Sequence, residues 1–176
     1  GETDTYQFNL RASQFVPLWF DHVLNVRGWT SVVEEYGDSD WVPIFDRLFM
    51  GGPRTVRAFK YRKVGPKNED KEPLGGRSAA FVSAEYAIPI VEKVRLGIFY
   101  DAGMIWEGIY EKGSVYPEGE EEDVIVGDGE LYDGYGLGIR FDFPQFPIQL
   151  DYAWPVNTDD LLGDKGRFSF SIGYTY

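Results

Sequence analysis

The sequence predicts an all-β protein whose strands form an antiparallel meander in the wall of a transmembrane outer-membrane β-barrel. Apolar and polar residues alternate with a period of two along several segments, which is typical of strands with two unlike faces. The 176 residues include 21 glycines and 10 prolines, and 17% are aromatic, a composition that favours many short strands over a helix bundle. No apolar run approaches the roughly 18 to 20 residues that a membrane-spanning helix needs. A transmembrane barrel leaves no such run, because its strands alternate.

Seven segments carry the alternation, although the first two carry it weakly. In the last segment, bulky apolar side chains occupy one face, and serine, glycine and threonine occupy the other. The third and fourth segments place Glu85 and Asp101 on the polar face. The predicted strands are residues 6–13, 24–33, 81–88, 94–101, 135–143, 148–154 and 168–176; the apolar face of the last one carries Phe168, Phe170, Ile172, Tyr174 and Tyr176, and its other face carries Gly173.

The connections between the predicted strands are of two lengths. Residues 89–93 and 144–147 form short turns, whereas residues 36–78, 107–131 and 155–166 form long loops. Short turns on one rim and long loops on the other are typical of bacterial outer-membrane barrels. Aromatic residues near the strand ends suit the girdles at the two membrane interfaces, namely Trp106, Tyr110, Trp154 and Tyr176.

A soluble antiparallel barrel or sandwich is the alternative that periodicity alone leaves open. Its strands also alternate, but their apolar face points inward and packs. In this chain the apolar face is bulky and aromatic, while the opposite face mixes glycine, serine and charged residues. Such a mixture suits a wet lumen or an inserted loop better than a solvent-facing surface, so we favour the membrane barrel.

The composition also limits the partners and the chemistry. A net charge of −12 argues against nucleic acid as a partner, because no basic stripe is present to neutralise phosphates. The absence of cysteine excludes disulfides and thiolate metal sites within the chain. Residues 1–10 lack the basic start and apolar stretch of a secretory signal, so we expect either a removed signal or a fragment.

No cluster in the sequence predicts an active site or a metal site, and we therefore expect neither an enzyme nor a cofactor. His22 is the only histidine, so a histidine-pair zinc site cannot form, and we interpret it as a polar residue at a strand end. The carboxylates of residues 118–123 could attract divalent cations, but they lack ligand spacing and suit a solvated acidic surface loop within 107–131. Residues 134–138 resemble a phosphate-binding loop only superficially, since no helix follows them.

Residues 47–59 read Arg-Leu-Phe-Met-Gly-Gly-Pro-Arg-Thr-Val-Arg-Ala-Phe, and this segment resembles the sixth-loop motif of the BamA family. The family motif has an aromatic residue, two glycines, and then Val-Arg-Gly followed by Phe or Tyr. These positions correspond here to Gly51, Gly52, Val56, Arg57 and Phe59. Further blocks that resemble the family follow in the right order: Val64-Gly65-Pro66, Leu74-Gly75-Gly76, Ala84-Glu85-Tyr86, Phe99-Tyr100-Asp101-Ala102-Gly103 and Asp151-Tyr152-Ala153-Trp154-Pro155.

The resemblance implies that the loop of residues 36–78 folds back into the barrel lumen. It also implies that the loop arginine, Arg57, contacts the glutamate and the aspartate of the two following strands, Glu85 and Asp101. The alternation agrees independently, because both carboxylates fall on the polar face. A guanidinium in a partly dehydrated lumen needs such partners, so we expect these three residues to form a latch that holds the loop inside. The alternative is that Arg57 is a solvated loop residue.

Two departures from the family pattern bear on the geometry. Ala58 stands where the family usually has glycine, so either the loop tip adopts an ordinary conformation or the local turn differs. The family's barrel has sixteen strands preceded by periplasmic polypeptide-transport-associated domains, and the seven predicted strands match only its last seven. An open sheet would leave unpaired backbone groups in lipid, so we expect residues 1–176 to be the C-terminal part of a larger barrel. Closure as a small barrel with an eighth short strand is the alternative.

The resemblance further implies an assembly factor of the bacterial outer membrane that folds and inserts other β-barrel proteins. Its partners would then be unfolded outer-membrane protein clients, accessory assembly subunits and membrane lipid. The final strand would form one side of a lateral seam that opens and pairs with a client strand, and Gly173 would weaken that strand. A two-partner secretion transporter of the same superfamily and a small self-closing structural or ligand-binding barrel are the alternatives.

Overall fold

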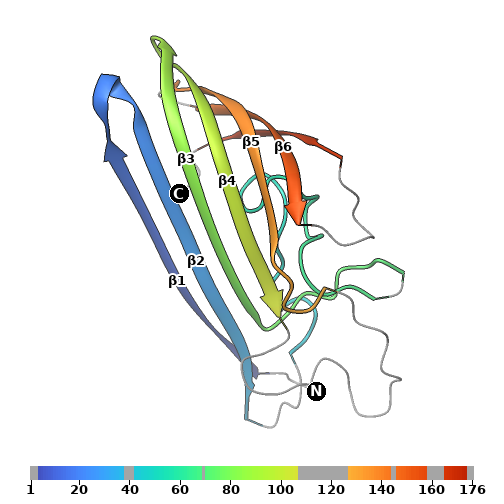
Figure 1. Cartoon of the computed structure of the whole chain (residues 1–176). Coiled ribbons are helices and arrows are strands. Elements are labelled where there is room, and N and C mark those ends of the chain that lie inside the picture. Colours follow the sequence, from blue (N-terminus) through green and yellow to red (C-terminus); the bar gives the residue numbers. More distant parts are fainter. Residues whose placement is uncertain are drawn as a thin grey trace.

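The structure, a computed structural model, describes residues 4–37, 42–68, 70–106, 127–143, 146–157 and 165–173. In these residues, seven strands form one antiparallel sheet in which each strand pairs with the next along the chain (Figure 1). The predicted all-β meander is therefore confirmed. The strands are β1 (Asp4–Pro17), β2 (Val23–Tyr36), β3 (Ser78–Val91), β4 (Val94–Trp106), β5 (Tyr132–Phe141), β6 (Ile148–Asn157) and β7 (Arg167–Ile172).

Most strand boundaries differ from the predicted ones by a few residues. β1 and β2 are longer than expected, because their pairing continues without a break from Asp4 opposite Tyr36 to Pro17 opposite Val23. The alternation of apolar and polar residues is lost near the ends of these two strands, whereas the strand pairing continues to their ends. β5 ends at Phe141 and not at residue 143. The predicted final strand ends at Ile172, and its residues 174–176 lie outside the described part of the chain.

The meander places the connections between strands at two opposite ends of the sheet. The turns after β1 and β3 lie together at the upper end of the sheet in Figure 1, and the chain leaves β2 and β4 at the opposite end. Trp19–Asp21 form a single 3-10 turn between β1 and β2, where the His22 Nδ1 atom lies 2.6 Å from the Tyr86 hydroxyl. The helices in the described residues include none that is both long and apolar enough to cross a membrane.

The two faces of the sheet differ in the way that the alternation predicts. Phe168, Phe170 and Ile172 of β7 are 63%, 51% and 55% exposed, so they do not pack into a dry centre. The opposite face of the sheet carries the charged and small residues, and the loop between β2 and β3 lies against it. Other large side chains on the exposed face are Ile98, Tyr100, Tyr135, Leu137, Ile139 and Tyr152.

The hydrophobic core lies between the sheet and this loop (described residues 42–68 and 70–77), which we call the lumen loop after its predicted location. Aliphatic and aromatic side chains of the loop pack against the inner faces of β3, β4, β5 and β6. An apolar loop surface meeting an apolar part of the inner wall stabilises the folded-back position of the loop. The core includes Met50, Val56, Ala58, Phe59 and Val64 from the loop, and Ala79, Phe81, Phe99, Ile105, Tyr132 and Ala153 from the wall.

Candidate functional site

Two glycines turn the lumen loop so that its arginine reaches the wall. Gly51 and Gly52 adopt φ of 114° and 98°, a region of backbone conformation that favours glycine. The turn is closed by the Gly51 amide, which donates to the Thr55 hydroxyl at 2.9 Å, and by the Gly52 amide, which donates to the Phe59 carbonyl at 3.0 Å. Val56 and Phe59 of the motif are buried at 0% and 3% exposure, so they anchor the loop on both sides of Arg57.

Ala58 occupies the family's glycine position without backbone strain, because its φ is not positive. Of the two readings that the sequence leaves open, the ordinary conformation is the one observed. The methyl group of Ala58 lies against Gly134 of β5, where a Cβ atom on Gly134 would approach it to 2.5 Å. A glycine in the wall therefore makes room for the alanine in the loop.

Arg57 makes its densest contacts with Asp101, on the inner face of β4. The Arg57 Nε and Nη2 atoms donate to the two oxygens of the Asp101 carboxylate at 2.7 and 2.8 Å, in the bidentate geometry that a guanidinium favours. The backbone amide of Arg57 donates to the same carboxylate at 3.1 Å. Asp101 also accepts a hydrogen bond of 2.7 Å from the Ser83 hydroxyl. Each side chain is only 1% exposed, so the ion pair is shielded from water.

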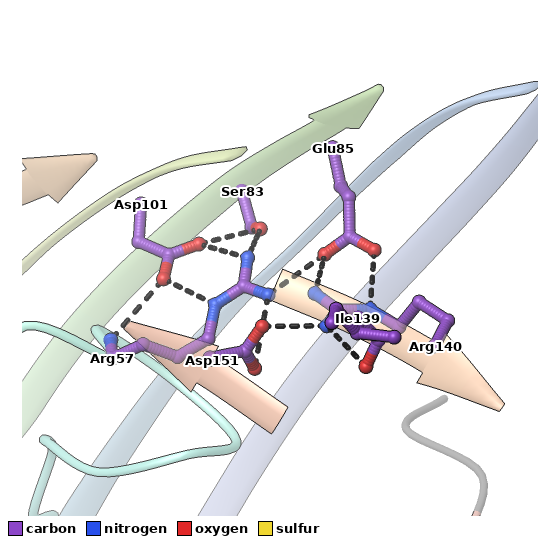
Figure 2. Close-up of polar contacts among 7 residues, drawn as sticks. All are labelled: Arg57, Ser83, Glu85, Asp101, Ile139, Arg140 and Asp151. Carbon is purple, nitrogen blue, oxygen red and sulfur yellow. Dashed lines mark hydrogen bonds and ion pairs between the residues drawn. The ribbon is translucent and has the colours of Figure 1, made fainter. Parts of the chain in front are cut away.

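The remaining donors of Arg57 face β3. Its Nη1 atom donates to Glu85 at 2.7 Å, and its Nη2 atom donates to the Ser83 hydroxyl at 3.3 Å. The guanidinium also lies 3.4 Å from the centre of the Phe99 ring, in cation–π geometry. The structure thus brings together the three residues that the sequence singles out (Figure 2).

The environment of Arg57 favours its charged form. Burial by itself lowers the pKa of a guanidinium. The hydrogen bond and the charge of Asp101, with the charges of Glu85 and Asp151, outweigh burial and raise the pKa of Arg57 above its ordinary value. Arg57 therefore remains a cation across the physiological pH range.

Two further residues complete the site: Asp151, which the sequence marks only as part of a block that resembles the family, and Arg140, which was not predicted. Arg140 of β5 donates from Nε and Nη2 to the two oxygens of Glu85 at 2.8 and 2.7 Å, and from Nη1 to Asp151 of β6 at 2.5 Å. Asp151 is also 3.7 Å from the Arg57 Nη1 atom. The period of two places Arg140 and Asp151 on the polar face, and that face is the signal that could have identified them.

We call these five residues, Arg57, Glu85, Asp101, Arg140 and Asp151, the charge cluster. They come from the lumen loop and from four consecutive strands, so the cluster joins the loop to most of the described inner wall (Figure 2). Two cations face three carboxylates, which leaves a net charge of 2 − 3 = −1. The arginines donate hydrogen bonds to both oxygens of Glu85 and Asp101 and to one oxygen of Asp151, so the arrangement suits a cationic side chain. No group of three or more potential metal-ligating side chains that could hold a metal ion is found in the described residues.

The other predicted features are only partly described. Gly173 has a φ of 105°, and its amide donates to the Pro147 carbonyl at 2.9 Å, so the chain turns away from strand geometry directly after β7. The predicted positions Tyr110, Tyr174 and Tyr176, and the acidic run at residues 118–123, lie outside the described residues.

Comparisons with known proteins identify what this architecture is similar to. A family model described as the Omp85 superfamily domain matches residues 1–176. The outer membrane protein assembly factor BamA of Neisseria meningitidis serogroup B is 30% identical over 181 residues, which cover 92% of this chain and 23% of that protein. The crystal structure of BamA from Haemophilus ducreyi lacking POTRA domains 1-3 superposes with a TM-score of 0.71 at 22% identity, over 96% of this chain and 35% of that one. The structure of CdiB from Acinetobacter baumannii superposes with a TM-score of 0.61 at 16% identity, over 98% and 27%. The chain thus spans less than a quarter of the BamA sequence that it matches.

Proposed function

This chain belongs to the Omp85 superfamily, and from that premise we propose that it is the C-terminal part of the barrel of an outer-membrane protein assembly factor. The complete protein folds β-barrel clients and inserts them into the bacterial outer membrane through a lateral seam. The observation that carries the proposal is the 30% identity to the assembly factor of Neisseria meningitidis over 92% of the chain.

The geometry of β7 supports the seam. β7 is an edge of the described sheet and pairs with β6 over only six residues, whereas β1 and β2 pair over fourteen. Such a short edge strand presents free backbone donors and acceptors to a client strand, and pairing with them is a recurring mode of polypeptide recognition. The kink at Gly173 limits how far the pairing extends.

The charge cluster supports a role for the lumen loop in this function. When a seam beside β7 opens, the wall loses support at one edge. The loop, tied by Arg57 to β3 and β4 and seated on the inner faces of β5 and β6, holds these strands together. We therefore assign the latch role to Arg57, Glu85 and Asp101. The partners are unfolded outer-membrane protein clients, accessory assembly subunits and lipid, and no cofactor is required.

Site-specific crosslinking in lipid vesicles tests the seam. A photoreactive residue is placed at Phe168 of β7 in the complete protein, and a matched control is placed at Tyr152 of β6. These two positions are paired in the sheet and share the exposed face, but they lie one strand apart. An unfolded β-barrel client is expected to crosslink at Phe168, to crosslink far less at Tyr152, and to gain heat-modifiable mobility faster than in empty vesicles. Equal crosslinking at both positions, or no acceleration, contradicts the proposal.

The same vesicles separate the alternatives. A two-partner secretion transporter of the superfamily delivers its polypeptide across the membrane, so the client ends unfolded in the vesicle interior and not in the bilayer. The likeness to CdiB shares the fold alone and does not favour this outcome. A small self-closing barrel predicts that the 176 residues refold alone in detergent as a compact, heat-modifiable monomer.

A further inference from the structure

Arg140 contacts the same carboxylates as Arg57 but belongs to the wall and not to the loop. It holds both oxygens of Glu85, and it reaches Asp151 on the neighbouring strand. None of these three hydrogen bonds involves a residue of the lumen loop. The contacts can therefore persist when the loop moves, whereas every contact of Arg57 is lost.

We propose that Arg140 is a positioning residue that makes the latch reversible: it remains as the counter-ion of Glu85 and Asp151 when the lumen loop withdraws. The proposal rests on the proposed function in that a working seam requires the loop to loosen. It goes further by stating that Arg140, a residue of the wall, determines how easily the lumen loop leaves the charge cluster.

The charges of the cluster give the direction of the effect. With the loop seated, the net charge is −1, and when Arg57 leaves, Arg140 alone faces three carboxylates at 1 − 3 = −2. Without Arg140, the same step leads from −2 to −3, with no cation in the cluster to separate the carboxylates. Unpaired like charges in a partly dehydrated wall are costly, so the loop of such a variant is held more tightly. Arg27 of β2 is paired with Ser83 across the sheet and adds positive charge nearby, but it is present in both states and cancels from the comparison.

The direction separates this role from simple structural support. If Arg140 only braced the wall, its removal would loosen the site and let the loop leave more often. The proposal predicts the opposite. The two roles therefore give changes of opposite sign in one measurement, the rate at which the loop exposes its buried side chains.

Thiol labelling measures that rate, because the chain contains no cysteine. Val56 is 0% exposed and lies beside Arg57, so in a Val56→Cys background a water-soluble maleimide reacts only when the loop has left its seat. The protein is the complete barrel in lipid vesicles, with any cysteine elsewhere replaced by serine. Arg140→Gln is expected to slow labelling roughly tenfold, a typical size for the coupling between interacting sites. Arg57→Gln is expected to accelerate it by a similar factor.

Three variants control for other causes. Arg95 lies opposite Arg140 on the neighbouring strand β4, but its ion pair is with Asp142 and not with the charge cluster. Arg95→Gln therefore removes a nearby cation without removing a cluster contact, and the labelling rate of this variant should stay within about twofold of the parent rate. Arg140→Lys keeps the charge and should stay near the parent rate. The double variant Arg140→Gln with Asp151→Asn restores the net charge of the cluster to −1 with the loop seated and −2 with the loop withdrawn. Its labelling rate should therefore return toward the parent rate.

Faster labelling in Arg140→Gln overturns the proposal, as does a double variant that labels as slowly as Arg140→Gln. If Arg140→Gln does not fold, the lysine variant and the double variant still decide, because structural support predicts faster labelling in both. The client-insertion assay is a separate readout. If client insertion fails while the labelling rates follow the predicted order, the proposed function is wrong and this inference stands. If client insertion succeeds while the labelling rates do not follow that order, this inference is wrong and the proposed function stands.

Discussion

Replacing Asp101 by asparagine tests the energetic weight of the latch, because Asp101 is the carboxylate with the most contacts to Arg57. It accepts three hydrogen bonds from Arg57, one of them from the backbone amide, and a fourth from Ser83. Asparagine keeps the shape but loses the charge, and its NH₂ group faces an arginine donor in place of an acceptor. The change therefore leaves a buried guanidinium with fewer partners than it has donors.

The expected cost follows from these contacts. Removing one partner of a buried ion pair costs about 3–5 kcal/mol. Here Glu85 and Asp151 remain close to the guanidinium, at 2.7 and 3.7 Å, so we take the lower limit. A loss of about 3 kcal/mol corresponds to an increase of roughly 150-fold in the population of the withdrawn loop.

Hydrogen exchange reads this population directly, because the Arg57 amide is itself bonded to Asp101. In vesicles containing the complete barrel, the peptide that includes residues 55–60 should exchange about 150-fold faster in Asp101→Asn than in the parent. Asp142→Asn is the matched control. Asp142 also pairs with an arginine, Arg95 at 2.9 Å, but both side chains are more than a third exposed, so we expect a change of about 0–1 kcal/mol and none at Arg57. Exchange at Arg57 that is unchanged in Asp101→Asn would refute the assignment of Asp101 as the main anchor.

Three further predictions concern the loop, its seat and the outer face. Arg57→Lys should reduce client insertion several-fold although it keeps the charge, because lysine cannot reproduce the bidentate contact with Asp101. Arg54→Lys, on the exposed part of the loop, should leave insertion unchanged, and equal insertion by the two variants contradicts the prediction. Gly134→Ala should destabilise the seated loop by about 1–3 kcal/mol through overpacking, measured by exchange of the loop amides. Adding Ala58→Gly should restore only part of the loss, because the added Cβ atom would still approach the Trp154 carbonyl oxygen to 2.6 Å; a double variant with no recovery at all argues against the contact with Ala58. Leu137→Arg places a charge on the outer face of β5 and should cost about 2–4 kcal/mol in urea unfolding from vesicles, a loss that should be absent if that face is wet.

The period of two was sufficient to predict the sheet and the side of it on which each side chain lies. It placed Glu85 and Asp101 on the inner face, and the loop motif supplied the arginine between them. Antiparallel neighbours in a meander bring the two carboxylates onto adjacent strands. Their contact with Arg57 was predicted from the resemblance to the BamA family and not from the periodicity. The distances were not predicted, because register and loop conformation set them.

Arg140 and Asp151 show where the sequence became insufficient. The period of two places both on the polar face, but their contact depends on a register in which Asp151 lies opposite Gly138, two residues from Arg140. The missing side chain of Gly138 leaves space for the long arginine to lie across the strand toward Asp151. A one-residue slip would turn Asp151 to the other face. Hydropathy alone does not fix such a register between two strands that alternate equally well.

The position of the lumen loop in the chain imposes an order on folding. Arg57 precedes all its partners, with Glu85 28 residues later, Asp101 44 residues later, and Asp151 a further 50 residues on, since 151 − 101 = 50. Contacts between distant residues form late, because chain closure must come first. Arg57 therefore makes its full set of contacts only after the four strands β3 to β6 have paired in the correct register. A bound lumen loop then indicates that these four strands have folded without a register shift.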